Sequence, residues 1–441
     1  MNQEPVVQRQ PWAEASERFA EFATKPHCVW LDTAVGAMGY SILAAEPSEI
    51  VRSKGRRIEI ISADGTRVIE GNPFDVLGEQ LANRRNTAIA KFPIGAAIGY
   101  FGYDLKNFVE RLPANAVDDL GLPDCWFGFY DNLLVFDHAR KKVWEVVGPR
   151  GFGVRPARVT PRRPSAELCS NFTRDSYRAA VLRAKQYIAA GDIYQVNLSQ
   201  RFQCGVDASA TELYGALRES NPAPYCAYLD IGEAQILSTS PECFLNIRQR
   251  RVVTRPIKGT RARGATPQDD AVVAAQLLAA PKDNAELVMI TDLERNDLGR
   301  VCEFGSVHVS ELVRVETYAT VHHLVSTVEG SLRHDVSHVD CVRACFPGGS
   351  ITGAPKIRAM EIIDELEPHA RGVYTGAIGF LGYNAITHLN VAIRTVVNQG
   401  GELTFHAGGG IVTDSEPDAE YDETFAKAQG ILNAIERLRL R

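Results

Sequence analysis

Lys258 and Glu242 are the side chains in this sequence whose settings most favour chemistry. Lys258 lies in RPIKGTRARG (residues 255–264), where an apolar stretch gives way to a glycine turn. It is either a solvated surface charge or a partly desolvated lysine whose lowered pKa makes it nucleophilic. Glu242 follows Pro241 in STSPECFL, amid small and apolar residues. It is either a carboxylate at a strand edge or a carboxyl group with a raised pKa that serves as a general acid.

Acidic residues gather on a predicted helix over residues 283–301, whose apolar positions recur at helical spacing. Mg²⁺ prefers few carboxylates, together with waters and substrate oxygens. Acidic residues on such a helix commonly face water, so the spacing leaves both interpretations open. The candidates for holding a cation are Glu286, Glu294 and Asp297.

The C-terminal run HAGGGIVTDSEPDAEYDETFAKAQGIL (residues 406–432) joins glycines to a predicted helix. The glycines at 408–410 allow a ligand to approach the backbone closely. Three charged side chains then share one helix face at i, i+3 and i+7, namely Glu420, Glu423 and Lys427. That face presents either a solvated ion pair between Glu423 and Lys427, or a cation and an anionic substrate held together.

A second glycine-rich loop opens FPGGSITGAPKIRAMEIIDELEP (residues 346–368) and runs into a predicted helix with Pro355 in its first turn. Such a helix start gathers free N–H groups and binds anions. The loop nearly matches a Walker A motif, but Ala354 follows Gly353 where that motif requires lysine. The pattern therefore favours a carboxylate over a nucleotide phosphate, with a purely structural turn as the alternative.

Two further candidates lie between these segments. His323, in TVHHLVST, is either a hydrogen-bonded core histidine or a catalytic one. Arg394, in LNVAIRTVV, is predicted to point inward from a strand whose opposite face carries Leu389, Val391 and Ile393. An inward arginine needs an anionic partner. Together these residues suit a small molecule that bears several carboxylates and binds Mg²⁺.

The elements that must position these residues indicate an α+β fold. A helix is predicted from Arg174 to Ala190, with Thr173 as its N-cap and Gly191 as its stop. Alternation over residues 194–199 then predicts a half-buried strand. Hairpin-like segments follow one another without regular strand–helix alternation, which favours mostly antiparallel sheets.

Two segments of the sequence resemble each other, GAAIGYFGYD (residues 95–104) and TGAIGFLGYN (residues 375–384). Either this similarity is chance, or the two segments form equivalent strands in two sheets. A stretch rich in Pro, Gly and Arg over residues 148–170 predicts a linker. It separates an N-terminal region, 1–147, from a catalytic region, 171–441.

Composition excludes several classes of protein. The chain has 441 residues and a net charge of −6, which disfavours a nucleic-acid partner. No apolar run is long enough to cross a bilayer, and residues 1–11 lack the pattern of a secretory signal. Nine cysteines without a C-x-x-C pair indicate free thiols in a reducing cytoplasm.

The motifs resemble those of the chorismate-utilising enzymes, which include anthranilate synthase component I, aminodeoxychorismate synthase component I, and the isochorismate and salicylate synthases. PIKGTRARG, AELVM…DLERNDLGRV, TYATVHHLVSTVEG, FPGGSITGAPKIRAMEII, YTGAIGF, NVAIRT and AGGGIV…EYDETFAKA occur here in this order. The resemblance is dense from about Arg174 to the C-terminus. It implies two packed antiparallel sheets wrapped by helices, in one intertwined unit whose active site holds Mg²⁺ and chorismate.

The resemblance also implies roles for individual residues. The metal ligands would be Glu286 and Glu423, with Glu420 beside them. The contacts to substrate carboxylates would come from Arg394, Tyr374 and Lys427, and from backbone groups around Ser350, Thr352, Gly408, Gly409 and Gly410. Catalysis would fall to Lys258, Glu242 as the general acid, and His323 near the departing C4 hydroxyl.

Lys258 decides which member the chain resembles. Anthranilate synthases carry alanine in the corresponding PIAGT, whereas PIKGT is the aminodeoxychorismate synthase form. A lysine bonded to C2 of chorismate directs ammonia to C4, giving 4-amino-4-deoxychorismate for 4-aminobenzoate and folate synthesis. Anthranilate synthase component I, which puts ammonia on C2, is the alternative. A non-catalytic binding subunit would lack Glu286 and Glu423, which are present.

The ammonia source and a regulatory pocket are the last implications. The sequence has no glutaminase nucleophile elbow, so the resemblance implies a separate glutamine amidotransferase subunit. A tryptophan pocket is implied by two segments that contribute Leu31, Asp32, Thr33, Asn221, Pro222 and Tyr225. The first segment departs from the LLES form of anthranilate synthase, which argues against feedback inhibition and leaves a structural tryptophan as an open alternative.

Overall fold

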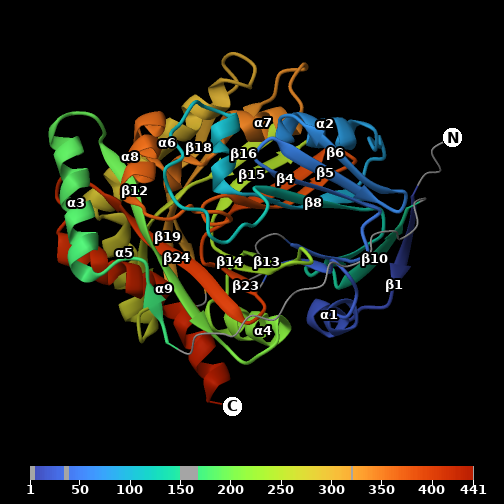
Figure 1. Cartoon of the computed structure of the whole chain (residues 1–441), viewed down its shortest axis with the longest axis horizontal. Helices are drawn as coiled ribbons and strands as arrows, with labels where there is room; N and C mark the ends of the chain where they lie inside the picture. The colour runs from blue at the N-terminus through green and yellow to red at the C-terminus, as the bar shows by residue number, and fades with distance from the viewer. Residues whose placement is uncertain (1–4, 34–38, 149–166, 319–320, 441) are drawn as a thin grey trace.

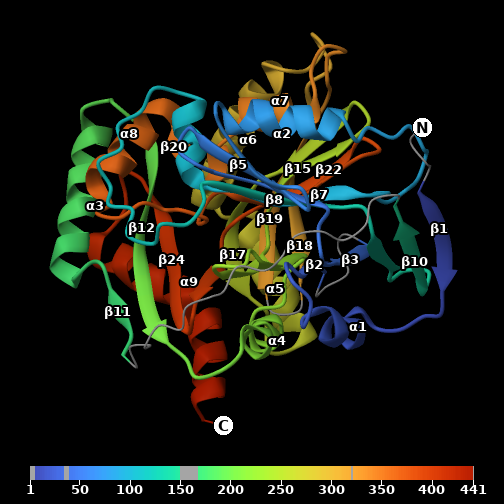
Figure 2. The same cartoon turned by 45° about the vertical axis from the view of Figure 1, so that its right-hand side comes forward.

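The computed structural model describes residues 5–33, 39–148, 167–318 and 321–440. The named strands in these ranges form two 12-stranded sheets, and all of their pairings are antiparallel. Helices cover the outer faces of both sheets (Figures 1 and 2). The predicted α+β fold with two packed antiparallel sheets is confirmed.

Sheet A holds the strands that surround the C-terminal glycine run, in the order β1 (Val6–Gln10), β10 (Lys142–Val147), β9 (Leu133–Asp137), β3 (Tyr40–Ala44), β2 (Val29–Asp32), β13 (Tyr225–Asp230), β14 (Gln235–Ser240), β23 (Thr395–Gln399), β24 (Glu402–Ile411), β12 (Gln195–Gly205) and β11 (Cys169–Ser170), with β20 (Gly353–Ala354) beside β12.

Sheet B holds the strand of Lys258, in the order β17 (Ile257–Ala262), β19 (Val321–Ser331), β16 (Arg251–Arg255), β15 (Cys243–Arg248), β22 (Ile386–Val391), β21 (Ala377–Gly382), β7 (Ala96–Phe101), β8 (Cys125–Tyr130), β4 (Glu49–Lys54), β5 (Arg57–Ser62) and β6 (Gly65–Glu70), with β18 (His308–Thr317) beside β19.

The helices are α1 (Ala15–Phe22), α2 (Pro73–Ala82), α3 (Arg174–Ala189), α4 (Ala210–Ser220), α5 (Pro267–Leu278), α6 (Pro281–Gly299), α7 (His338–Cys345), α8 (Lys356–Leu366) and α9 (Pro417–Arg439), with short 3₁₀ turns η1 (Tyr103–Phe108) and η2 (Gly349–Ile351). In Figure 1, α2 and α7 lie beyond sheet B, and α1 and α4 lie beyond sheet A.

Three apolar cores follow from this layering. Leu31 and Ile42 of sheet A meet Ile98 and Trp126 of sheet B between the sheets. A second core packs α2 and α7 on the outer face of sheet B. A third packs α1, α4 and α9 on the outer face of sheet A. Because each sheet buries both faces, few strands show a simple alternation of apolar and polar residues.

The two halves of the chain share both sheets. In each sheet the strands before residue 148 form one continuous block and the later strands form the other, and the blocks join at β2–β13 and at β21–β7. The division into regions 1–147 and 171–441 therefore follows the sequence and not the layers. Most of the predicted linker lies outside the described residues.

The two similar segments lie side by side in one sheet, so their assignment to two sheets is wrong. β7 pairs with β21, and Gly99 lies opposite Gly379. A Cβ at Gly99 would lie 1.9 Å from the Trp126 carbonyl oxygen, and one at Gly379 would lie 2.0 Å from that of His388. The close approach of neighbouring strands explains why both segments carry glycine there.

Local predictions hold for α3 and fail in part for β12. Thr173 caps α3, accepting a hydrogen bond from the Ser176 backbone N–H in a capping box. The strand after it is not half-buried, since Asn197 and Ser199 are buried as well as their apolar neighbours. The polar side of β12 contacts Glu367, whose carboxylate accepts hydrogen bonds from Ser199 N and Oγ.

No helix in the described ranges is both long and apolar enough to cross a membrane. All nine cysteines are free thiols, and eight of them are buried. The chain therefore builds this fold without a disulfide framework.

Candidate active site

Lys258 lies on β17, and its side chain points toward the glycine-rich loop that contains Ser350. Its ammonium Nζ donates to the carbonyl oxygen of Ser350 at 3.4 Å. Burial lowers the pKa of Lys258, and the nearby carboxylate of Glu286 partly opposes this shift. Lys427, Glu242 and Glu423 also act on this amine electrostatically. The structure thus brings the predicted nucleophile, acid and metal ligands into one site.

Glu242 lies where β14 of sheet A gives way to β15 of sheet B, and only 5% of it is exposed. Burial raises the pKa of Glu242 to about 7, against opposing contributions from the Ser350 side chain, the Lys258 charge and the Ile257 backbone. A carboxyl group in this setting is about half protonated at neutral pH, far more than an exposed glutamate. It has the environment that a general acid requires.

The glycines of β24 face the charged side of α9. A Cβ at Gly409 would lie 3.2 Å from both Glu420 Oε2 and Glu423 Oε1, and 3.4 Å from Lys427 Nζ. Lys427 also donates to the Gly408 carbonyl oxygen at 2.8 Å and pairs with Glu423 at 2.7 Å. The predicted ion pair exists, but it lies over the glycine run and not only against bulk water.

The carboxylates of this face suit Mg²⁺. Glu420 is buried and accepts a hydrogen bond from Ser415 at 2.6 Å, while Glu423 is half-exposed. Within the described ranges no three His, Cys, Asp or Glu side chains already form a closed metal-binding group. Two carboxylates over a glycine cradle, with Glu286 across the site, fit an ion that takes its remaining ligands from water and substrate.

Arg394 is not on a strand, contrary to the prediction. It occupies the break between β22 of sheet B and β23 of sheet A, with a φ of 49°. The chain changes sheets here, which requires a turn that a continuous strand cannot supply. The guanidinium donates to Asn221 Oδ1 at 3.0 Å, and no carboxylate in the described ranges pairs with it. Burial lowers the pKa of Arg394.

His323 lies on β19, where the charge of Arg394 acts on its ring. Its Nδ1 is 2.9 Å from the Thr260 hydroxyl, and its ring lies 5.8 Å from that of Tyr318. Burial and the charge of Arg394 lower the pKa of His323 to about 4. The imidazole is therefore neutral at physiological pH, so it can polarise a hydroxyl group but holds no acidic proton of an imidazolium to donate.

The remaining predicted substrate contacts divide into two groups. Tyr374 stacks on His406 at 4.8 Å, and its hydroxyl meets Asn197 and Ser199 beside the glycine run. The Thr352 hydroxyl donates instead to the Gly348 carbonyl oxygen at 3.0 Å, so it shapes its own loop.

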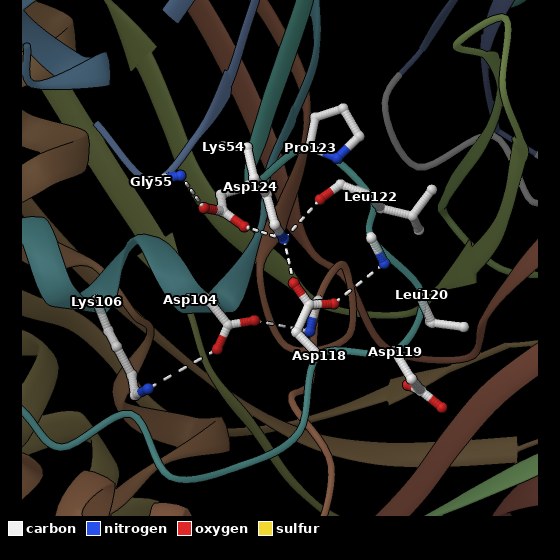
Figure 3. Close-up of polar contacts among 12 residues, drawn as sticks. Lys54, Gly55, Asp104, Lys106, Asp118, Asp119, Leu120, Leu122, Pro123 and Asp124 are labelled. Atoms are coloured by element: carbon white, nitrogen blue, oxygen red, sulfur yellow. Dashed lines mark hydrogen bonds and ion pairs between the residues drawn. The ribbon is translucent and has the colours of Figure 1, made fainter. Parts of the chain in front are cut away.

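The N-terminal half holds the segment that carries Tyr374. Asp104 accepts a hydrogen bond from Gly372 N at 3.0 Å, and Figure 3 shows this carboxylate within a network of aspartates and lysines. In the same network Lys54 donates to the Leu122 carbonyl oxygen and pairs with Asp124, each at 2.8 Å. These contacts attach the loop between β7 and β8 to β4.

Sequence reasoning missed how two of the acidic candidates are used. Asp297 pairs with Lys356 at 2.5 Å, so the protein supplies the cation itself. Glu294 is buried under the glycine-rich loop. Lys282, whose charge acts on Glu420 and Glu423, was also missed. Lys356 lies within the PKIRAM segment, but nothing in that segment indicates a partner 59 residues away.

The two segments predicted to form a tryptophan pocket lie side by side, because β2 pairs with β13 and Asp32 lies opposite Cys226, the residue after Tyr225. Asp32 is buried, and its carboxylate accepts from Arg218 at 2.5 Å and from Ser41 at 3.1 Å. Leu31 lies in the core between the sheets, and the buried hydroxyl of Thr33 has no hydrogen-bond partner among the described residues. Tyr225 packs against His388, Pro222 precedes β13, and Asn221 contacts Arg394. Asn221 therefore links this region to the candidate active site.

The site places the partly buried amine of Lys258 beside the buried carboxyl group of Glu242 and the glycine-rich loop, within a fold of two packed antiparallel sheets. The family model of the chorismate binding enzymes matches residues 26–433. The chain belongs to this family.

Relatives with two different activities are similar to the chain. It is 38% identical to aminodeoxychorismate synthase component 1 of Bacillus subtilis (strain 168), covering 97% of this chain and 95% of the relative. It is 42% identical to anthranilate synthase component 1 of Thermus thermophilus, covering 86% and 85%. The crystal structure of anthranilate synthase component I from Streptococcus pneumoniae TIGR4 has a TM-score of 0.78 at 32% identity, covering 89% and 92%. Overall identity does not separate the two activities.

Proposed function

We propose that this chain is an aminodeoxychorismate synthase component I of 4-aminobenzoate and folate synthesis, acting in the cytoplasm. It would convert chorismate and ammonia to 4-amino-4-deoxychorismate. The observation that carries the proposal is the partly buried amine of Lys258, whose charge interacts with Glu242 and Glu286. The anthranilate synthase pattern has alanine at this position and needs no amine there.

The first step uses the lysine as a nucleophile. The lone pair of neutral Lys258 forms a bond to C2 of the ring, the ring double bonds shift, and the C4–O bond breaks. The hydroxyl leaves as water with the proton of Glu242, while His323 orients it. Arg394 and Lys427 hold the substrate carboxylates. Lys427 is a cation beside the glycine run of β24, and Arg394 is a cation at the crossover between the two sheets.

The second step restores the enzyme. Ammonia adds at C4, the double bonds shift back, and Lys258 leaves C2 with its electron pair. The ammonium formed at C4 gives a proton to the Glu242 carboxylate. Mg²⁺ held by Glu286, Glu423 and Glu420 would bind the ring carboxylate and offset charge that develops on it. Ammonia would come from a separate glutamine amidotransferase subunit.

The pH dependence of this reaction is expected to be bell-shaped. The reactive state has one proton on the pair, on Glu242, and none on the Lys258 amine. Below about pH 7 both groups are protonated, so kcat/KM rises through the Glu242 pKa of about 7. At higher pH kcat/KM falls again as the pair loses its last proton. The midpoint of this fall lies below the ordinary lysine pKa of 10.5, because burial lowers the pKa of Lys258. Chorismate consumption measured across pH checks this, and a limb near pH 7 that persists in E242Q would contradict it.

The product decides between the two candidate activities. Purified protein with chorismate, an ammonium salt and Mg²⁺ is expected to form 4-amino-4-deoxychorismate, detected by chromatography and converted to 4-aminobenzoate by added lyase. Glutamine should replace the ammonium salt only when an amidotransferase subunit is present. Anthranilate as the sole product, visible by its fluorescence, would reject the proposal and favour anthranilate synthase component I.

A further inference from the structure

The glycine-rich loop between α7 and α8 is tied to α6 by a buried carboxyl group that the proposed reaction does not use. Glu294 is 3% exposed. Its Oε1 accepts a hydrogen bond from Gly349 N at 3.0 Å, and its Oε2 lies 3.3 Å from the Thr254 hydroxyl of β16. One side chain therefore joins a helix, a strand of sheet B and the loop.

The loop is held next to the reacting groups. Ser350 follows Gly349 directly, and its carbonyl oxygen accepts from Lys258 Nζ while its side chain hydrogen-bonds Glu242. A Cβ at Gly349 would lie 3.2 Å from Glu294 Oε1, so loop and carboxyl group are in close contact. A shift of Gly349 would move Ser350 against both Lys258 and Glu242.

The surroundings favour a neutral carboxyl group at Glu294. Lys356, the nearest cation, is occupied by Asp297 at 2.5 Å and by the carbonyl oxygens of Pro347 and Cys345 at 2.9 and 3.1 Å. Burial and the charge of Asp297 raise the pKa of Glu294 to about 8. The titratable groups that face it are Asp297, Lys356, Glu242, Cys243 and Cys345. Both carboxyl oxygens are used, since Oε1 accepts from Gly349 N and Oε2 accepts from the Thr254 hydroxyl.

We infer that Glu294 is a positioning residue, whose side chain ties Gly349 to α6 and so fixes Ser350 against Glu242 and Lys258. The inference rests on the proposed function only in that these two groups react with chorismate. It holds whichever carbon of chorismate is aminated, and it is therefore tested on chorismate consumption and not on product identity.

Three substitutions at this position separate anchoring from packing and charge. E294Q keeps an acceptor for Gly349 and a hydrogen-bonding group for the Thr254 hydroxyl, so it should consume chorismate within about threefold of the unsubstituted protein. E294M fills the same space without either group and should lower kcat/KM by about 10²-fold, the usual effect of small misplacements at a reacting site. E294D shortens the side chain and should fall between them. D292A, an exposed change on the same helix, is the matched control.

Two further measurements keep the test decisive. The backbone amide of Gly349 should exchange with deuterium faster in E294M and E294D than in E294Q, a difference that does not depend on activity. Thermal unfolding should show E294M folded, because it removes a carboxyl group from beside Asp297. Should E294M not fold, E294D carries the test.

Two results would overturn the inference. One is wild-type chorismate consumption by E294M or E294D. The other is E294Q as slow as E294M. If the unsubstituted protein consumes chorismate but makes anthranilate, the proposed function fails while the role of Glu294 stands.

Discussion

Replacing Lys258 by alanine (K258A) is expected to lower kcat with ammonia by about 10³-fold or more, since loss of a covalent nucleophile removes the step on which the others depend. The lysine is partly buried, and burial lowers its pKa, so a neutral amine is more readily available for attack than in a solvated lysine. The K258A protein should still fold, because in the described part of the chain Lys258 Nζ makes a single long hydrogen bond, of 3.4 Å, to the Ser350 carbonyl oxygen.

The covalent adduct gives a direct measurement. Unsubstituted protein mixed with chorismate and Mg²⁺, with ammonia withheld, should gain the mass of chorismate less one water. K258A should gain nothing, while K141A, an exposed lysine paired with Glu14, should behave as the unsubstituted protein. Absence of an adduct in the unsubstituted protein under every condition would leave Lys258 with a purely electrostatic role.

The second large effect is expected for Arg394→Ala, and it should separate activity from stability. The guanidinium is partly buried, and in the described ranges its hydrogen-bond acceptor is the Asn221 amide oxygen alone. Truncating one member of a buried charge pair costs about 2–5 kcal/mol, so kcat/KM for chorismate should fall by about 30-fold or more, chiefly through KM. Folding should not weaken, because a partly buried and unpaired cation is removed.

Steady-state kinetics and urea unfolding of the same R394A preparation check both halves of this expectation. R251A, which changes an exposed arginine of sheet B, should leave KM near its original value. A fall in the free energy of unfolding of R394A, with KM unchanged, would identify Arg394 as a structural residue of the crossover and not as a substrate contact.

Much of the site could be anticipated from the sequence, because its groups lie in short motifs. Lys258, Glu242 and the carboxylates of α6 and α9 each occupy a distinct segment, and the structure brings these segments together. Thr173 likewise marks the start of α3 through local hydrogen bonding alone. In both cases the signal lies within a few residues of the group concerned.

The failures all involve partners distant in sequence. The alternating sequence of β12 predicts that its polar side faces solvent. In the structure Ser199 on that side donates to the carboxylate of Glu367, which lies 168 residues further along the chain. Arg394 reads as a strand residue because the alternation continues through it, and only the move from sheet B to sheet A requires the turn. Asp297 reads as a metal ligand because Lys356 is not visible as its neighbour.

The strand pairs β2–β13 and β21–β7, where the two halves of the chain join in each sheet, limit how the polypeptide can be shortened. The candidate catalytic groups all lie after residue 240, so a truncated version containing only the second half would retain every one of them. Such a version would also leave the backbone N–H and C=O groups of β13 and β21 without their neighbours. Bare strand edges of this kind associate with one another and precipitate. We therefore expect the first half to be needed for a soluble protein, although it carries none of the candidate catalytic groups.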